Sequence, residues 1–167
     1  FNIVKDEISK GKQAYVILPL IEDSEKLNLN SAIKVYEYLS EKIYPQFKVG
    51  LLHGKLSSQE KNKILNLFES NEINILVSTT VIEVGIDVPN ASIMMIYNSE
   101  RFGLSQLHQL RGRVGRDSYR SYCYLITSEN NALTNRRLQV LQNSNDGFYI
   151  AEKDLELRGP GLSLIHI

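Results

Sequence analysis

The sequence predicts an α/β fold, in which a parallel sheet has helices on both faces and a helical hairpin follows towards the C-terminus. Short runs rich in aliphatic and β-branched residues alternate with stretches of helical periodicity, and turn-forming or polar residues separate them. Alternation of this kind is typical of strand–helix–strand units, whose strands pair in parallel. The 167 residues suffice for one domain with a sizeable core.

The first strand and helix are predicted from an apolar run and a proline. Residues 14–20, a run that Pro19 closes, are expected to form a buried strand. A polar insertion at 22–30 separates this strand from a helix predicted at 31–43, whose apolar residues recur at helical spacing. Pro45 ends that helix, because proline disfavours a helical conformation in the residue before it.

The remaining elements continue the alternation. A second strand is expected at 48–52, and Ser57 or Ser58 is expected to cap the next helix. The apolar stripe of that helix consists of Ile64, Leu65, Leu67 and Phe68. The later elements are predicted as strands at 73–77, 93–97 and 121–127, a helix at 104–110, and two short helices within 130–157, around the break Asn145-Asp146-Gly147.

Composition and cysteine content narrow the possible functions. Lys+Arg and Asp+Glu both count 19, so a nucleic-acid contact has to rest on a local surface. The single cysteine, Cys123, excludes an internal disulfide and a zinc site built on cysteines, and its apolar surroundings favour a buried structural thiol. The chain contains no run of transmembrane length and no signal-peptide pattern, which favours a cytoplasmic location.

An arginine–glycine run at 111–116 is the strongest chemical signal. Arginine presents planar forks of N–H donors that suit phosphate oxygens, and glycine permits close approach of the backbone. The run is therefore interpreted as a segment that binds phosphate, and a solvated basic turn is the alternative. We expect it to lie at the carboxyl ends of the strands, where ligands of parallel sheets bind.

Two further polar segments are predicted at the same edge of the sheet. His53 and Gly54 follow the second strand, and Ser78, Thr79 and Thr80 follow the third. The hydroxyl and backbone N–H groups of the serine and threonines are expected to be exposed, as a cradle for a DNA phosphate. An ordinary loop histidine and an ordinary helix cap are the structural alternatives.

Segments 77–89 and 106–116 together resemble motifs V and VI of superfamily 2 helicases, in the second RecA-like domain of the motor. Motif VI has the pattern Gln-x-x-Gly-Arg-x-Gly-Arg. This pattern is met by Gln109, Gly112, Arg113, Gly115 and Arg116.

Further segments resemble the RecG family of bacterial ATP-dependent DNA helicases. These segments are Pro19 to Glu25, Leu51 to Gly54, Glu100 to Gln106, Ser121 to Cys123, Asn145 to Phe148 and Leu157 to Gly161. The transcription-repair coupling factor shares motifs V and VI and a similar C-terminal hairpin, but the segments 19–22 and 145–148 favour RecG.

The resemblance implies that ATP is held between two RecA-like domains. The phosphate loop and the Asp-Glu-x-His box of the first domain do not occur in this sequence, so ATP and Mg²⁺ are expected mainly on an absent N-terminal motor domain. Arg113 and Arg116 match the arginine fingers that act on the γ-phosphate. Residues that match positions for ATP binding or coupling are Gln109, Gly112, Gly85 and Asp87.

The resemblance also assigns roles on the DNA side. DNA-binding positions are matched by Ser78, Thr79, Thr80, His53 and Gly54, and the translocation loop after the hairpin by Arg158, Gly159 and Gly161. A hairpin that only packs through Leu138, Leu141, Phe148 and Leu155 is the alternative. No arrangement of metal ligands is recognised in the chain.

The domain organisation expected from these resemblances has three parts. Residues 1–128 form the second RecA-like motor domain, 129–161 form the hairpin with its loop, and 162–167 are a non-native tail. The implied function is that of the second motor domain of an ATP-dependent double-strand DNA translocase. This translocase would remodel stalled replication forks and Holliday junctions in recombination and repair, with a wedge domain upstream, and the fragment alone would be inactive. The alternatives are a non-catalytic DNA- or protein-binding module and a transcription-repair coupling translocase.

Overall fold

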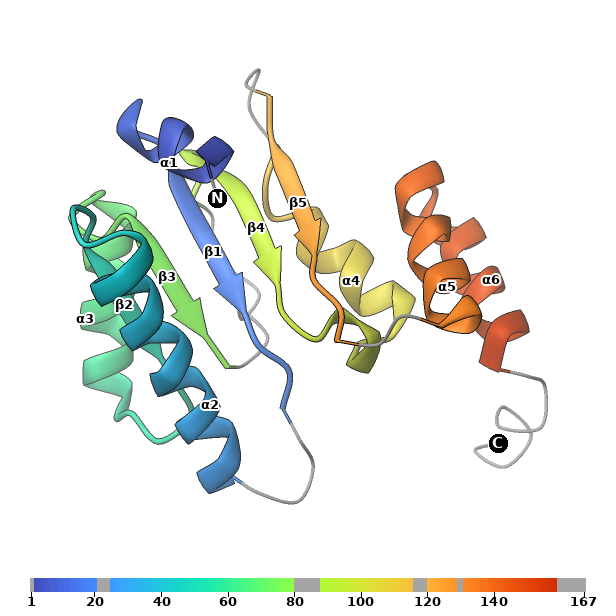
Figure 1. Cartoon of the computed structure of the whole chain (residues 1–167), viewed down its shortest axis with the longest axis horizontal. Helices are drawn as coiled ribbons and strands as arrows, with labels where there is room; N and C mark the ends of the chain where they lie inside the picture. Colours follow the sequence, from blue (N-terminus) through green and yellow to red (C-terminus); the bar gives the residue numbers. More distant parts are fainter. Residues whose placement is uncertain (1, 21–24, 80–87, 116–119, 129–130, 159–167) are drawn as a thin grey trace.

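Five parallel strands form one sheet in the computed structural model, which describes residues 2–20, 25–79, 88–115, 120–128 and 131–158 (Figure 1). The strands are β1 (Gln13–Ile17), β2 (Val49–Leu52), β3 (Ile75–Ser78), β4 (Ala91–Ile96) and β5 (Tyr122–Leu125). Their order across the sheet is β2-β3-β1-β4-β5, and every neighbouring pair is parallel. The predicted α/β fold with a parallel sheet is confirmed.

Helices cover both faces of this sheet. They are α1 (Asn2–Ser9), α2 (Glu25–Glu37), a π-helix η1 (Tyr38–Ile43), α3 (Ser58–Glu69), a 3₁₀ helix η2 (Ser99–Arg101), α4 (Leu104–Arg111), α5 (Ala132–Asn143) and α6 (Gly147–Arg158). The last two form the predicted hairpin beyond β5 (Figure 1). In the described parts of the chain, no helix combines the length and the apolar composition that crossing a bilayer requires.

Two hydrophobic cores lie on opposite faces, because successive side chains of a strand point to opposite sides. Tyr15 and Ile17 of β1 belong to the core that includes Phe68 of α3 and Leu107 of α4. The intervening Ala14 and Val16 belong to the other core, which includes residues of α1, α2 and η1. Strands that are apolar on both faces follow from this arrangement, as the nearly continuous apolar runs in the sequence indicated.

Three local features of the helices, two of which differ from the prediction, have simple causes. The helix predicted to start at residue 31 begins at Glu25, because residues 25–30 contain no proline or glycine that would stop it. Helix α1 was not predicted, since only two of its eight residues, Val4 and Ile8, are buried. Of the two proposed caps for α3, Ser57 is the one used: its Oγ accepts the N–H of Glu60 at 3.1 Å.

A buried amide group organises the amino ends of the strands. Gln13 is fully buried, and its Nε2 donates to the carbonyl oxygens of Phe68 and Ile73, the latter at 2.9 Å. Its Oε1 accepts from Nδ2 of Asn90 at 3.1 Å, and the same Nδ2 donates to the carbonyl of Gly11 at 2.7 Å. One side chain therefore satisfies a carbonyl of α3 and a carbonyl of the loop before β3, and holds Asn90 of the loop before β4, which explains why a polar residue starts an otherwise apolar strand.

Replacing Gln13 with leucine is expected to lower the free energy of unfolding by about 1–3 kcal/mol, because the carbonyls of Phe68 and Ile73 each lose a buried side-chain donor. Urea denaturation followed by circular dichroism measures the change. Gln139→Leu, at an exposed position of α5, is the matched control and is expected to stay within about 0.5 kcal/mol of the wild type. Equal stabilities of the two variants would contradict this role of Gln13.

Candidate functional site

The polar segments singled out in the sequence lie at two opposite edges of the sheet. Strands β2 and β3 end at Leu52 and Ser78, so the segments that follow them lie at the carboxyl edge. Gly115 lies beside Ser121, the residue before β5, which places the arginine run at the amino edge. The expectation that all these segments meet at the carboxyl ends is therefore wrong.

Helix α4 causes this separation. It starts just after η2, where the N–H of Ser99 donates to the carbonyl of Ile126 at 2.9 Å, near the carboxyl end of β5. The helix then leads the chain back to the amino end of that strand (Figure 1). A helix that returns the chain between parallel strands has to run in the opposite direction to them. The residues at its C-terminal end are thereby carried to the far edge of the sheet.

The C-terminal end of α4 presents the predicted coupling and finger residues. Gln109 and Gly112 are exposed, and Arg113 is half-buried. The N–H of Gly112 donates to the carbonyl of His108 at 3.1 Å, and that of Arg113 to the carbonyl of Leu110 at 3.0 Å, so the helical path continues beyond the helix. Residues four apart on such a path are neighbours, which places the side chains of Gln109 and Arg113 on the same side.

Gly115 is required by the turn that follows. Its φ of 80° lies in the left-handed region, and a Cβ at this position would overlap the hydroxyl of Ser121. Both conditions exclude a larger residue without rearrangement of the loop. The second glycine of the run therefore serves the local backbone, in agreement with its position in the motif.

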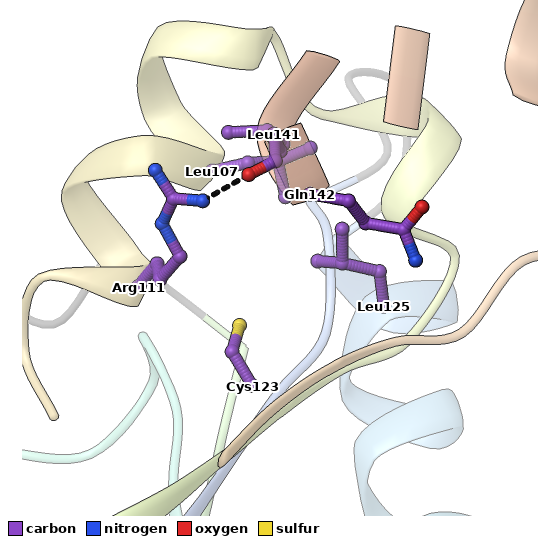
Figure 2. A pocket seen from close by; sticks show the side chains of 6 residues that line it. All are labelled: Leu107, Arg111, Cys123, Leu125, Leu141 and Gln142. Atoms are coloured by element: carbon purple, nitrogen blue, oxygen red, sulfur yellow. Dashed lines mark hydrogen bonds between the residues drawn. The ribbon is translucent and has the colours of Figure 1, made fainter. Parts of the chain in front are cut away.

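Arg111, the first arginine of the run, is bound within the protein. Its Nη1 donates to the carbonyl of Leu141 (Figure 2), and its Nη2 donates to the carbonyl of Ser144 at 2.9 Å. The same Nη2 lies 2.9 Å from Nδ1 of His108. The carbonyls belong to the C-terminal end of α5, where helical carbonyls lack intrahelical partners. The interpretation of the whole run as phosphate-binding is therefore corrected for Arg111, which joins α4 to the hairpin.

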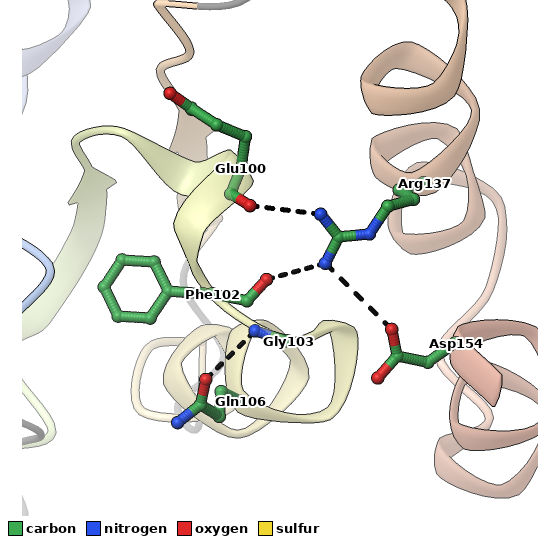
Figure 3. Close-up of polar contacts among 6 residues, drawn as sticks. All are labelled: Glu100, Phe102, Gly103, Gln106, Arg137 and Asp154. Carbon is green, nitrogen blue, oxygen red and sulfur yellow. Dashed lines mark hydrogen bonds and ion pairs between the residues drawn. The ribbon is translucent and has the colours of Figure 1, made fainter. Parts of the chain in front are cut away.

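Arg137 of α5 makes a second connection, at the other end of α4. Its Nη1 donates to the carbonyl of Glu100 at 3.1 Å and its Nη2 to that of Phe102 at 2.7 Å (Figure 3). The same Nη2 lies 4.0 Å from a carboxylate oxygen of Asp154 in α6, with the two side chains 15% and 10% exposed. Sequence reasoning missed Arg137, because its partners are main-chain carbonyls that carry no sequence signal.

Glu100 is part of the same connection. Burial acts to raise the pKa of its carboxyl group, but hydrogen bonds from Ser128, from its own backbone and from Thr127 and Asn98 outweigh burial and lower it. The Ser128 hydroxyl donates to Oε1 at 2.7 Å. The carboxylate is therefore ionised at neutral pH and fixes the turn between β4 and α4 to the segment after β5.

The hairpin packs through part of its apolar surface only. Leu141 of α5 and Ile150 of α6 are buried in the core shared with α4, and Leu138 is partly buried. Phe148 and Leu155, by contrast, are 91% and 49% exposed, so the alternative of a hairpin that packs through all four residues does not hold for these two. Both project from the outer side of α6, where the described residues provide no covering element.

His53 supports a turn at the carboxyl edge. Its Nδ1 accepts the N–H of Lys55 at 3.2 Å, and its carbonyl accepts that of Leu56 at 3.3 Å. The pKa of its imidazole is lowered, chiefly by burial, which keeps the ring neutral at pH 7. Gly54 beside it is exposed, and the space where its Cβ would lie is open. These features suit the predicted structural support of a contact rather than acid–base chemistry.

Ser78 and Thr79 are buried rather than exposed. Ser78 is fully buried, and its carbonyl accepts the N–H of Leu18 at 2.9 Å. Thr79 is 3% exposed, and its N–H donates to the carbonyl of Leu52 at 3.2 Å. The expected cradle of exposed groups is therefore corrected for these two residues, because the parallel sheet extends its hydrogen bonding through them. Their assignment to DNA binding stays a prediction.

Several predicted site residues lie outside the described residues. These are Thr80, Gly85, Asp87, Arg116, Gly159 and Gly161. Arg158 is the last residue of α6, and the structure describes its backbone only.

A cavity of about 180 Å³ lies between α4, β5 and α5 (Figure 2). It is lined by Leu107, Arg111, Cys123, Leu125, Leu141 and Gln142. Burial raises the pKa of the Cys123 thiol from 9.0 to about 11, although Arg111 acts in the opposite direction. The predicted structural thiol is confirmed as a partly buried, protonated group. In the described ranges no three His, Cys, Asp or Glu side chains gather closely enough to hold a metal ion.

A twisted parallel sheet with motif VI at the end of α4 defines the C-terminal domain of a helicase motor. The family described as the helicase conserved C-terminal domain matches residues 1–118, and the chain belongs to this family. Within it, the relatives are RecG helicases. The chain is 55% identical over 161 residues to the ATP-dependent DNA helicase RecG of Synechocystis sp. and 53% identical over 158 residues to that of Bacillus subtilis.

These alignments cover 96% and 95% of the chain but only 19% and 23% of the two relatives, so the chain spans about a fifth of their length. A solved structure of RecG bound to a three-way DNA junction is 48% identical and superposes with a TM-score of 0.79, over 97% of this chain and 21% of that one. The C-terminal domain of the DEAD-box protein Dbp5, at 17% identity and a TM-score of 0.59, covers 85% of this chain and 78% of its own, and shares the fold.

Removing the guanidinium of Arg111 should loosen the hairpin, because two carbonyls at the end of α5 lose a charged donor. For Arg111→Met we expect amide hydrogen exchange in 132–158 to accelerate at least about tenfold, with β1 to β4 unchanged. Arg136→Met, at an exposed arginine on the same helix α5, is the control. Equal exchange in the two variants would show that Arg111 does not hold the hairpin.

Alkylation of Cys123 should be slow at moderate pH. With a pKa of about 11 in place of 9.0, its thiolate fraction at pH 8 is about 100-fold lower than that of an ordinary cysteine. The rate of reaction with iodoacetamide is therefore expected to keep rising through pH 10, relative to N-acetylcysteine measured alongside. A plateau of the rate at pH 9 would mean that the thiol is not shielded, and Cys123→Ser gives the background.

Proposed function

We propose that this chain is the second motor domain of an ATP-dependent DNA helicase of the RecG type, which translocates on double-stranded DNA and remodels branched DNA such as stalled forks and Holliday junctions. The observation that carries the proposal is the 52–55% identity to RecG proteins, which extends over 93–96% of the chain. Identity at this level includes the hairpin as well as the sheet. The activity belongs to a longer protein, of which a chain of this length supplies about a fifth.

The position of Arg113 supports its role as an arginine finger, together with Arg116. Its side chain is half-buried at the end of α4, directly beyond the last helical turn. A guanidinium held at the surface by a short turn can reach a phosphate that another domain presents. Such a group stabilises the charge that develops on the γ-phosphate, an effect of roughly 10³–10⁵ in rate in GTPases that use an arginine finger.

The residues of this chain fit half of an ATP site. ATP supplies a phosphoanhydride whose hydrolysis drives the motor, and the chain contributes cations to it without a phosphate loop of its own. Gln109, exposed one turn before Arg113, is proposed to link the nucleotide to the rest of the motor. The same role in ATP binding or coupling is proposed for Gly112, Gly85 and Asp87. Mg²⁺ would be held by the N-terminal motor domain, which carries the acidic box in this kind of helicase.

The hairpin is proposed to transmit closure of the nucleotide site. Arg111 and Arg137 attach it to the two ends of α4, so a displacement of α4 also displaces α5 and α6. In the proposed motor this displacement moves the loop that begins at Arg158 and includes Gly159 and Gly161. Packed helices joined by charged hydrogen bonds move as one unit, which is what a transmission element requires.

DNA contacts are proposed at the carboxyl edge, where the turn of His53 and Gly54 is exposed and the chain continues through Thr79 to Thr80. The structure of RecG on a three-way junction supports a branched DNA partner for the parent protein. A wedge domain and the first motor domain of the same protein complete the proposed machine. Its location is proposed to be the cytoplasm, where bacterial DNA is replicated.

Replacing Arg113 with alanine in the full-length parent protein is expected to reduce ATP turnover on forked DNA by at least about 10²-fold, because the finger acts chiefly in the transition state. Binding of the fork, measured by fluorescence anisotropy, is expected to stay within about twofold. Arg136→Ala, at an exposed arginine of α5, is the matched control and should retain turnover. A parallel loss of binding and turnover would assign Arg113 to DNA instead.

A further inference from the structure

The open face of strand β5 carries a ladder of planar side chains. Tyr122 and Tyr124 alternate along the strand and project from the same face of the sheet, and the guanidinium of Arg120, two residues before Tyr122, lies over the Tyr122 ring. Both tyrosines are half-buried, and Arg120 is exposed. Strand β5 is the last strand of the sheet, and within the described residues it pairs with β4 alone.

No described helix covers this ladder. On this side of the sheet, α1 packs against β1, and α2 packs against β2 and β3. Figure 1 shows β5 and the lower part of β4 facing the viewer with no helix in front of them, whereas α4 lies behind them. The tyrosines therefore border the core on this side without being enclosed by it.

The geometry of the rings is that of a stacking site. The rings of Tyr122 and Tyr124 are parallel within 9°, and their centroids are 6.3 Å apart. This separation is close to twice the roughly 3.4 Å rise of one stacked nucleotide. Two parallel rings at this spacing offer flat apolar faces at intervals that neighbouring bases of one strand can match.

Arg120 adds the charge that such a site needs. Its guanidinium carbon lies over the Tyr122 ring, 5.6 Å from the ring centroid, within the range of a cation–π contact. The N–H donors lie in the plane of the guanidinium, at its edge, where they can bind phosphate oxygens. A cation beside a row of rings complements a strand that carries phosphates and bases.

Among the described residues, Glu7 of α1 is an acidic group that acts electrostatically on Tyr124, and it has partners of its own within the protein. The carboxylate of Glu7, whose side chain is 15% exposed, lies 3.9 Å from Nζ of Lys10. The same carboxylate accepts the hydroxyl of Ser92 at 3.3 Å. The charge of Glu7 is thereby partly compensated, and the chain as a whole carries no net charge that would repel a polyanion.

We propose that the Arg120–Tyr122–Tyr124 ladder is a binding site for single-stranded nucleic acid, which stacks one or more bases on the tyrosines and a phosphate on Arg120. It goes beyond the proposed function, whose contacts with DNA lie at the carboxyl edge and in the hairpin. The ligand that fits this site is a single strand displaced from a remodelled junction. Stacking of this kind tolerates any sequence, because every base has a flat face.

Binding of a fluorescein-labelled oligothymidylate of about 16 nucleotides to the purified 167-residue chain tests the site. The variant Tyr122→Leu/Tyr124→Leu is expected to raise Kd at least about tenfold, and Tyr122→Phe/Tyr124→Phe to keep it within about twofold, because stacking needs the rings and not the hydroxyls. Tyr149→Leu, at a 42% exposed tyrosine on α6, is the matched control.

Salt dependence tests the part played by Arg120. Replacement by glutamine is expected to reduce the slope of log K against log salt concentration by about 0.7, the value for one phosphate contact on a single strand. An unchanged slope would show that Arg120 does not bind a phosphate. Circular dichroism of each variant shows whether the sheet is intact.

Crosslinking gives a readout that needs no variant. An oligonucleotide with 5-iodouracil, irradiated in complex with the wild-type chain, is expected to attach within the tryptic peptide 121–136, which contains both tyrosines. Attachment only to other peptides, an unchanged Kd of the leucine variant, or no binding of the wild type at about 100 µM would each overturn the proposal. Binding of forked duplex DNA is measured alongside. If the leucine variant binds it as the wild type does, failure of the single-strand site leaves the proposed function standing.

Discussion

Two guanidinium groups determine how the C-terminal hairpin lies on this domain. Arg111 and Arg137 donate to main-chain carbonyls near opposite ends of α4, and Asp154 completes the second connection from α6. Each charged donor satisfies carbonyls that a helix end or a turn leaves without partners. The hairpin has few buried apolar residues of its own, so these bonds set its position and, through α4, its relation to the proposed finger Arg113.

The direction of α4 separates two kinds of surface. It carries the arginine run from the carboxyl end of β4 to the amino end of β5, while His53 and Ser78 stay at the carboxyl edge. A stiff parallel sheet with a core on each face keeps the two edges at a constant distance. In the proposed motor, nucleotide and DNA would occupy these different edges, and the sheet would hold them apart while the hairpin moves.

The sequence predicted this fold because its strongest signals are local. Ala14 and Tyr15 enter different cores simply because they are neighbours in a strand, and Ser57 caps α3 through a partner three residues away. The burial of Ser78 and the exposure of Phe148 could not be predicted in this way. Both depend on what lies opposite in space: strand partners in one case, and the lack of a described covering element in the other.

The amino-acid sequence by itself determined the alternation of strands and helices, the two-faced core, the structural thiol of Cys123 and the position of motif VI, since periodicity and motif spacing are properties of the chain. Only the tertiary structure decided that Arg111 binds carbonyls of α5, that Gln13 joins α3 to two loops, and that the Arg120–Tyr122–Tyr124 ladder lies on an open face. The physical reason is that the contacts and the exposure of these side chains depend on groups far away in the sequence. These groups take up their positions only when the sheet assembles.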